Sequence, residues 1–160
     1  MHIFKWLGCL LLLAAGALTG LALLRFERRR VAQAEGFRAL LCLLRWQIDT
    51  LARPLPQILA TCDEGILAAC GWQEKARPAD FTALLDGVAL YLSEEVCSLL
   101  YDFKGALGTS YREEQQRTCD YHLSRLSPYC DTLRGELPKR ERVALFLPLA
   151  AALALILLLL

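Results

Sequence analysis

Residues 143–160 read VALFLPLAAALALILLLL, a run of eighteen residues without a charged or hydrogen-bonding side chain. As a helix rising ~1.5 Å per residue, the run is about 27 Å long, close to the hydrocarbon core of a bilayer. Twelve of its residues are Leu, Ile, Phe or Val, and their summed preference for the membrane is on the order of −5 kcal/mol. Pro148 removes one helix hydrogen bond, which membrane-spanning helices tolerate better than soluble ones. The run is therefore predicted to be a transmembrane helix rather than a buried core helix.

A second apolar run covers residues 6–24 and is interrupted only by the weakly polar Cys9 and Thr19. A cleaved secretory signal peptide is the alternative, since residues 15–17 (AGA) have the small side chains of a cleavage site and Lys5 would supply the basic start. However, the apolar run continues beyond that point and then meets a cluster of arginines, which is a stop-transfer pattern. We therefore expect an uncleaved membrane helix over residues 1–24.

The central segment, residues 25–142, is long enough for one domain with its own core. Its seventeen basic and seventeen acidic residues cancel, so no global field attracts nucleic acid or an anionic substrate. Basic residues gather at its two ends: Arg25, Arg28, Arg29 and Arg30, then Lys139, Arg140 and Arg142. The positive-inside rule then places the segment in the cytoplasm and both termini across the membrane. Membrane orientation already explains the arginine cluster. Binding of lipid or nucleic acid by these arginines is therefore the less favoured interpretation.

Apolar residues recur at helical spacing through the central segment. The stripes are Phe37, Leu40, Leu41, Leu44, Ile48 and Leu51; Phe81, Leu84, Leu85, Val88 and Leu92; and Val96, Leu99, Leu100, Phe103 and Leu107. Each stripe predicts an amphipathic helix. From Cys119 to Leu137 the apolar positions are spaced 4, 3, 4, 3, 4, which predicts one long helix with a narrow seam, kinked at Pro128 and running almost directly into the second membrane span. β-Branched residues are scarce and nothing alternates with period two, so no sheet is expected.

Proline, glycine and short polar residues set the expected helix boundaries. Pro54 ends the helix that begins near Val31, and Pro56 opens another that reaches about Cys70. Residues 71–80 form the one clear loop. The expected caps are Gly71 at a C-terminus and Asp80, Ser93 and Ser110 at N-termini, the last in a capping box with Glu113 after a break at Gly108. The fold class is therefore all-α: a helical bundle (25–142) flanked by two transmembrane helices (1–24 and 143–160).

No arrangement of residues indicates a metal, cofactor or catalytic site. The seven cysteines are odd in number, lack a C-x-x-C pair and are irregularly spaced, so they are expected to be small, reduced core residues. Cys119 and His122 lie three residues apart on one helix face and are the only candidate nucleophile pair. Glu94 and Glu95 suit a helix N-terminus better than acid–base chemistry. We expect a non-enzymatic chain that works by binding other proteins, without nucleic acid or a small-molecule substrate.

Residues 103–110 (FKGALGTS) followed by residues 112–115 (REEQ) resemble the F-x-x-x-L-G-x-S-D-x-x-x-Q signature of stage III sporulation protein AB. Residues 54–56 (PLP) are similar to the P-L-P-E-A-L stretch of the same family. The order of membrane helix, basic residues, helical domain and closing membrane helix also matches. Tyr111 stands where the family usually has Asp, and Gln57 where it usually has Glu.

The resemblance implies a protein of an endospore-forming bacterium, in the mother-cell membrane around the forespore. It would belong to a multi-protein channel or secretion-like complex between the two cells. The family's cytoplasmic domain is similar to the helical platform protein of type II secretion and type IV pilus machines. The resemblance therefore implies a platform that couples a cytoplasmic ATPase-like partner to membrane components.

Two other functions remain open: an adaptor or sensor that joins no channel, and a membrane enzyme using Cys119 and His122. The sequence also leaves open the oligomeric state and whether the two membrane helices pack together. A glycine pair, Gly16-x-x-x-Gly20, offers a flat strip for close helix packing in the first span.

Overall fold

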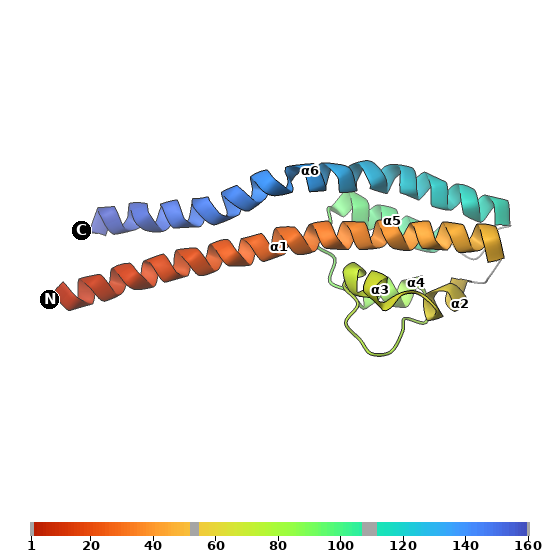
Figure 1. Ribbon diagram of the computed structural model, residues 1–160, viewed down its shortest axis with the longest axis horizontal. Helices are drawn as coiled ribbons and strands as arrows, with labels where there is room; N and C mark the ends of the chain where they lie inside the picture. Colours follow the sequence, from red (N-terminus) through yellow and green to blue (C-terminus); the bar gives the residue numbers. More distant parts are fainter. Residues whose placement is uncertain (1, 52–54, 107–111, 160) are drawn as a thin grey trace. The chain divides into compact units, whose positions relative to one another are not determined.

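The computed structural model describes residues 2–51, 55–106 and 112–159, and the regular structure within these ranges is helical, without a strand (Figure 1). The helices are α1 (His2–Leu51), α2 (Leu55–Ala60), α3 (Glu64–Cys70), α4 (Phe81–Asp86), α5 (Glu94–Ala106) and α6 (Arg112–Leu159). The predicted all-α fold is confirmed.

The chain forms two compact units. One consists of Met1–Arg29 and Gly135–Leu160, and we call it the paired-helix unit; the other is Arg30–Arg134, the bundle unit. The division predicted from hydropathy, at residues 24/25 and 142/143, stays a prediction.

The long helices α1 and α6 each contain a candidate membrane span. Over its most apolar eighteen residues, α1 has a mean hydropathy of 2.3 and α6 one of 2.1. Only 6% of that stretch is buried in α1, and 11% in α6. The core helix of a soluble protein would bury most of such a stretch. The length, composition and exposure of both segments are therefore consistent with membrane spans.

The two candidate spans pack against each other through small residues, which answers the question that the sequence leaves open. Figure 1 shows α1 and α6 running side by side through this unit. A Cβ atom added to Gly16 would lie 3.0 Å from both Ala152 Cβ and the Pro148 carbonyl oxygen. One added to Gly20 would lie 3.1 Å from the Ala144 carbonyl oxygen. The G-x-x-x-G strip of α1 thus contacts Ala144, Pro148 and Ala152, which lie four residues apart on one face of α6.

Pro148 gives this contact a further role. Because Pro148 has no N–H, the carbonyl oxygen of Ala144 has no donor in its own helix. A side chain on Gly20 would crowd that oxygen, because its Cβ atom would lie 3.1 Å away. The carbonyl that proline leaves without its helix partner thus lies at the contact between the two candidate spans.

Ion pairs join α1 and α6 at the polar end of the paired-helix unit. Arg28 Nε lies 2.7 Å from Glu141 Oε1, and Arg140 Nη1 lies 3.7 Å from Glu27 Oε1. Arg140 also bonds Glu136 on its own helix, at 2.8 Å. Two residues of the basic clusters are thus neutralised by carboxylates, whereas the sequence suggests only an excess of positive charge.

The core of the bundle unit consists of the predicted stripes. Phe37, Leu40, Leu41 and Leu44 of α1 are fully buried, as are Leu84 of α4, Phe103 of α5 and Cys119, Leu126 and Cys130 of α6. In Figure 1 the α1 part of this unit lies between α6 on one side and α2, α3 and α4 on the other. The helix expected over residues 119–137 is confirmed, and α6 continues through Pro128 without a break.

Two helix predictions are wrong because local caps end the helices early. The helix expected from Pro56 to about Cys70 is split into α2 and α3, since the Asp63 carboxylate accepts a 2.6 Å hydrogen bond from Gly65 N and starts a new helix. The helix expected from the apolar stripe over residues 81–92 ends at Asp86, and Gly87 is the C-cap of this helix, α4. Val88 is buried from a non-helical segment instead.

Other predicted boundaries are confirmed. Asp80 caps α4 by accepting from Ala83 N at 2.7 Å. Gly71 ends α3 with φ 104°, in the left-handed region that favours glycine. Ser93 holds the N-cap position of α5, because its carbonyl accepts from Cys97 N at 2.9 Å. Pro54, Gly108 and the Ser110 half of the capping box lie outside the described residues.

Candidate functional site

A buried glutamine that the sequence analysis missed positions the segment leading into α5. Gln33 of α1 is 2% exposed. Its Nε2 donates to the carbonyls of Cys70 and Ala89, both at 2.9 Å, and its Oε1 accepts from Tyr91 N at 2.7 Å. One amide thus satisfies three backbone groups from two separate segments. The only sequence signal was a glutamine four residues before Phe37, on the apolar face of α1.

Tyr129 holds the start of α5 against α6. Its hydroxyl oxygen accepts from Arg30 Nη2 and from Ser93 N, each at 3.1 Å. The two donors come from α1 and from the residue that caps α5, so one hydroxyl joins three parts of the bundle unit. The relative positions of α5 and α6 are thereby fixed at this end.

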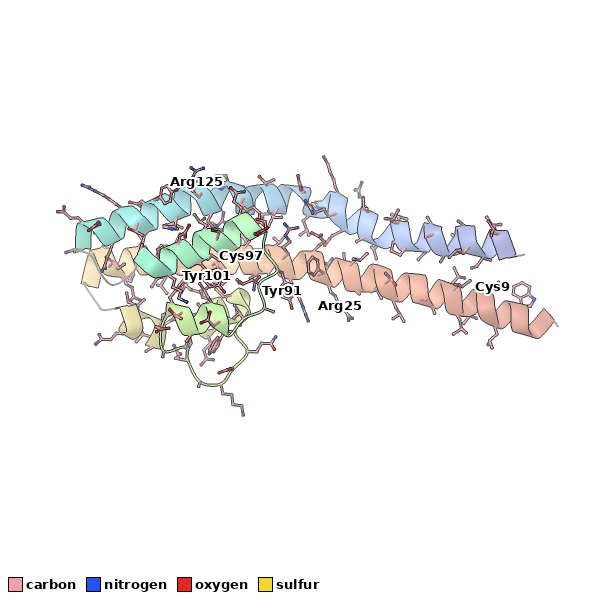
Figure 2. The ribbon with its side chains drawn as sticks, turned by 180° about the vertical axis from the view of Figure 1, so that it is seen from behind. Cys9, Arg25, Tyr91, Cys97, Tyr101 and Arg125 are labelled. Carbon is pink, nitrogen blue, oxygen red and sulfur yellow. The ribbon has the colours of Figure 1, made fainter. Side chains whose placement is uncertain are left out.

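Between these two helices runs a hollow of about 540 Å³, which we call the α5/α6 groove. Residues of both helices line it: Glu95, Val96, Leu99 and Asp102 of α5, and Tyr121 and Arg125 of α6. Tyr121 is 54% exposed, so the groove is open to solvent. Figure 2 labels Arg125 on α6 and Tyr101 on the neighbouring α5. The groove has an apolar floor with charged side chains along both walls.

The groove's charges are not matched to one another. The Arg125 guanidinium lies 5.9 Å from the centroid of the Tyr121 ring, in a cation–π contact. Among the described residues, Glu95, Asp102 and Arg125 make no ion pair within 4.0 Å, whereas Arg38 and Arg45 of the same unit pair with Asp131 and Asp120 of α6. Two carboxylates on one wall and a guanidinium on the other thus face the hollow.

A second hollow, of about 320 Å³, lies at the loop after α3. Trp72, Lys75, Arg77 and Glu64 are among the residues that line it. Trp72 Nε1 donates to the Ala76 carbonyl at 2.9 Å, and Arg77 lies 3.7 Å from Glu64. These contacts hold the loop to its own neighbours.

The candidate nucleophile pair is not arranged for catalysis. Cys119 is fully buried, and burial raises the pKa of its thiol to about 11, so the thiol is protonated at neutral pH. His122 is 6% exposed, with Nδ1 2.8 Å from the Thr118 carbonyl. Its ring packs edge-on against Phe103 and Tyr121, with centroids 5.0 and 5.2 Å apart. These contacts are those of a core histidine.

The remaining sequence candidates take structural positions. Cys62, Cys70 and Cys130 are buried as expected, but Cys42 is exposed on α1. Glu94 and Glu95 lie in the first turn of α5, where negative charge complements the helix dipole. Within the described part of the chain, no three His, Cys, Asp or Glu side chains are placed to hold a metal ion.

The family model of stage III sporulation protein AB matches residues 5–72 and 81–160 of the chain. The chain belongs to this family. Membership gives it a role in sporulation, and the family is not known as one of enzymes. No curated protein and no solved structure matches the chain.

The family match covers all residues that line one hollow but only half of those that line the other. Every residue of the α5/α6 groove falls inside the matched ranges, as does Gln33. Half of the lining of the loop hollow, including Lys75 and Arg77, belongs to the unmatched residues 73–80. The groove is therefore the better candidate for a function that this chain shares with its family.

Proposed function

We propose that the chain is a non-enzymatic platform of a channel or secretion-like complex between mother cell and forespore. It is anchored by α1 and α6 in the mother-cell membrane, with the bundle unit in the cytoplasm. There the bundle unit binds a cytoplasmic ATPase-like protein and connects it to other sporulation proteins in the membrane.

One observation carries this proposal: α1 and α6 each contain both a candidate membrane span and a share of the bundle core. Gly16 and Phe37 belong to the same helix, as do Ala152 and Leu126. Apart from the exposed loop between α3 and α4, a protein built in this way exposes mainly lipid-facing side chains and a helical surface. Such a surface suits binding to other proteins, and the buried, protonated Cys119 offers no competing chemistry.

Co-purification from sporulating cells tests the proposal. The full chain, tagged in its loop between Glu74 and Lys75, would be extracted in mild detergent and its bound proteins identified. We expect a cytoplasmic ATPase and further membrane proteins made at the same stage of sporulation. Recovery of neither class, from cells that require the chain to sporulate, would contradict the platform.

The adaptor or sensor that joins no channel remains the second candidate, since the unpaired charges of the α5/α6 groove suit any protein partner. The same experiment separates the two. An adaptor would bring down a cytoplasmic protein without the other membrane components, whereas a platform would bring down both.

A further inference from the structure

The groove is too open to be a small-molecule site. Sites for small ligands bury most of the ligand's surface in an enclosed, largely apolar pocket. Here Tyr121 is 54% exposed, and Glu95, Asp102 and Arg125 are all exposed to solvent. An open hollow between two helices instead fits the helix-in-groove mode of peptide recognition.

The positions of the charges define the side chains that would fit. Glu95 and Asp102 are seven residues apart on α5, which is about two helical turns or roughly 10 Å. Val96 and Leu99 form the apolar floor beside them, and Arg125 stands on the opposite wall. A complementary helix has apolar residues on the face that meets the floor, basic residues about two turns apart on one flank and an acidic residue on the other.

We propose that the α5/α6 groove binds an amphipathic helix of another protein, with its basic flank against Glu95 and Asp102 and its acidic flank against Arg125. This deepens the proposed function, since it states the chemistry of one partner that the platform holds. It rests on that function only in assuming that the bundle unit binds proteins.

A second copy of the chain fits the groove less well. Two copies related by a two-fold axis that passes through the groove would bring one hollow against the other, and two concave surfaces do not fill each other. A face distant from the groove could enter it only by a heterologous contact, which repeats into a ring or an open filament. A convex helix of another protein meets neither difficulty.

The test is a peptide-binding experiment with the full chain in lipid nanodiscs. The probe is a fluorescent synthetic helix of about 20 residues, long enough to be helical alone. It carries a leucine stripe, two lysines seven residues apart on one flank and a glutamate on the other. A second peptide has glutamate at both lysine positions and lysine at the glutamate position, in an otherwise identical sequence. Each exposed ion pair contributes little to the free energy of binding, so the difference in affinity between the two peptides is modest. We expect the first peptide to bind about tenfold more tightly than the second.

Charge reversal of the groove supplies the decisive comparison. In a variant carrying Glu95→Lys, Asp102→Lys and Arg125→Glu, the preference between the two peptides should reverse. All three positions are exposed, so the fold is expected to persist. Equal affinity of both peptides for the chain, or an unchanged preference in the variant, would overturn the proposal.

A matched control makes the same charge changes outside the groove, with Glu74→Lys, Glu114→Lys and Arg117→Glu, all at exposed positions. This variant should keep the original preference; if it reverses too, net charge rather than the groove selects the peptide and the proposal fails. Self-association of the chain that only the groove variant abolishes would assign the groove to a second copy and would also overturn it.

Failure of this inference can be told apart from failure of the platform. If cells lacking the chain complete sporulation, the platform is wrong, whatever the peptides show. If those cells fail to sporulate but the peptides bind without selectivity, the groove proposal alone is wrong.

Discussion

Gly36 of α1 lies against the backbone of Ala69 in α3, so closely that a Cβ atom on Gly36 would be 2.6 Å from the Ala69 carbonyl carbon. The nearest atoms belong to backbone rather than to a flexible side chain, so the two helices would have to separate to admit a methyl group. This contact places α3 on α1 next to Gln33, whose amide holds the carbonyl at the end of the same helix.

Replacing Gly36 by alanine is therefore expected to destabilise the bundle unit. Overpacking of a tight contact costs about 1–3 kcal/mol, more than the gain of about 1 kcal/mol in helix propensity. Chemical unfolding of the full chain in detergent, followed by circular dichroism, measures the change. Gly105→Ala is the control, because nothing lies within 4 Å of its Cβ position on α5; it should be neutral or slightly stabilising. Equal effects of the two variants would contradict the contact.

Gln33→Glu should make the stability of the chain depend on pH. A carboxylate there would place a charged oxygen against the carbonyls of Cys70 and Ala89, both bonded to Nε2 in the wild type. Burial then raises the carboxyl pKa above its value of about 4.3 in the unfolded chain. The folded state therefore keeps this proton to higher pH than the unfolded chain does. The variant is most stable below the unfolded-chain pKa of about 4.3 and loses stability as pH rises through the folded-state pKa. Unfolding measured at pH 4.5 and 7.5 checks the sign, and Gln33→Met, which does not titrate, should lack this dependence.

Alkaline pH should destabilise the wild-type chain through its buried thiols. Burial raises the pKa of Cys119 and of Cys130 to about 11, above the ~8.5 of an unfolded chain. The folded state therefore keeps both protons to higher pH, and the stability they contribute is lost between about pH 8.5 and 11. Unfolding at pH 8 and 10.5 should show a loss on the order of a few kcal/mol.

A double variant of these cysteines to alanine should lose part of that pH dependence and not all of it, because burial also raises the pKa of Cys70 and of Cys62. Cys42→Ala, at an exposed position, should retain it in full. The single variant Cys119→Ala should also still support sporulation, because the thiol belongs to the core. Loss of sporulation in cells that contain normal amounts of folded Cys119→Ala protein would favour the membrane enzyme instead.

Gly20→Leu should separate the two candidate spans. The added side chain meets the Ala144 carbonyl oxygen and the backbone of Leu145, and close approach through small residues is what holds such helices together. Titration of the chain from mild detergent into sodium dodecyl sulfate should show unfolding of the variant at a lower SDS fraction. Gly8→Leu serves as the control, since nothing lies within 4 Å of its Cβ position. Equal midpoints for the two variants would argue against the packing.

The sequence predicts the features that depend on periodicity. Phe37, Leu44 and Leu126 recur at helical spacing and are buried together, and the two apolar runs are evident from length and hydropathy alone. The errors arise where a single side chain outweighs a periodic pattern. Asp63 starts a new helix inside a predicted one, and Gly87 ends α4 although the apolar stripe continues to Val88.

The groove and its supports have no local sequence signal. Gln33 bonds residues 37 to 58 positions away, and Tyr129 bonds a backbone group 36 positions away. Glu95 and Arg125 face one hollow only because these contacts hold α5 beside α6. Such features depend on which elements meet in space. The family signature was nevertheless readable, because it consists of consecutive residues.

The most direct test of the platform is the location of the chain in sporulating cells. A fluorescent protein inserted between Glu74 and Lys75 would be followed through sporulation. The site lies in an exposed loop outside the family match, so insertion there should disturb the fold little. We predict signal only in the mother cell, gathered at the membrane around the forespore, in cells that still complete sporulation. Uniform membrane signal in growing cells, unchanged when sporulation begins, would contradict the account.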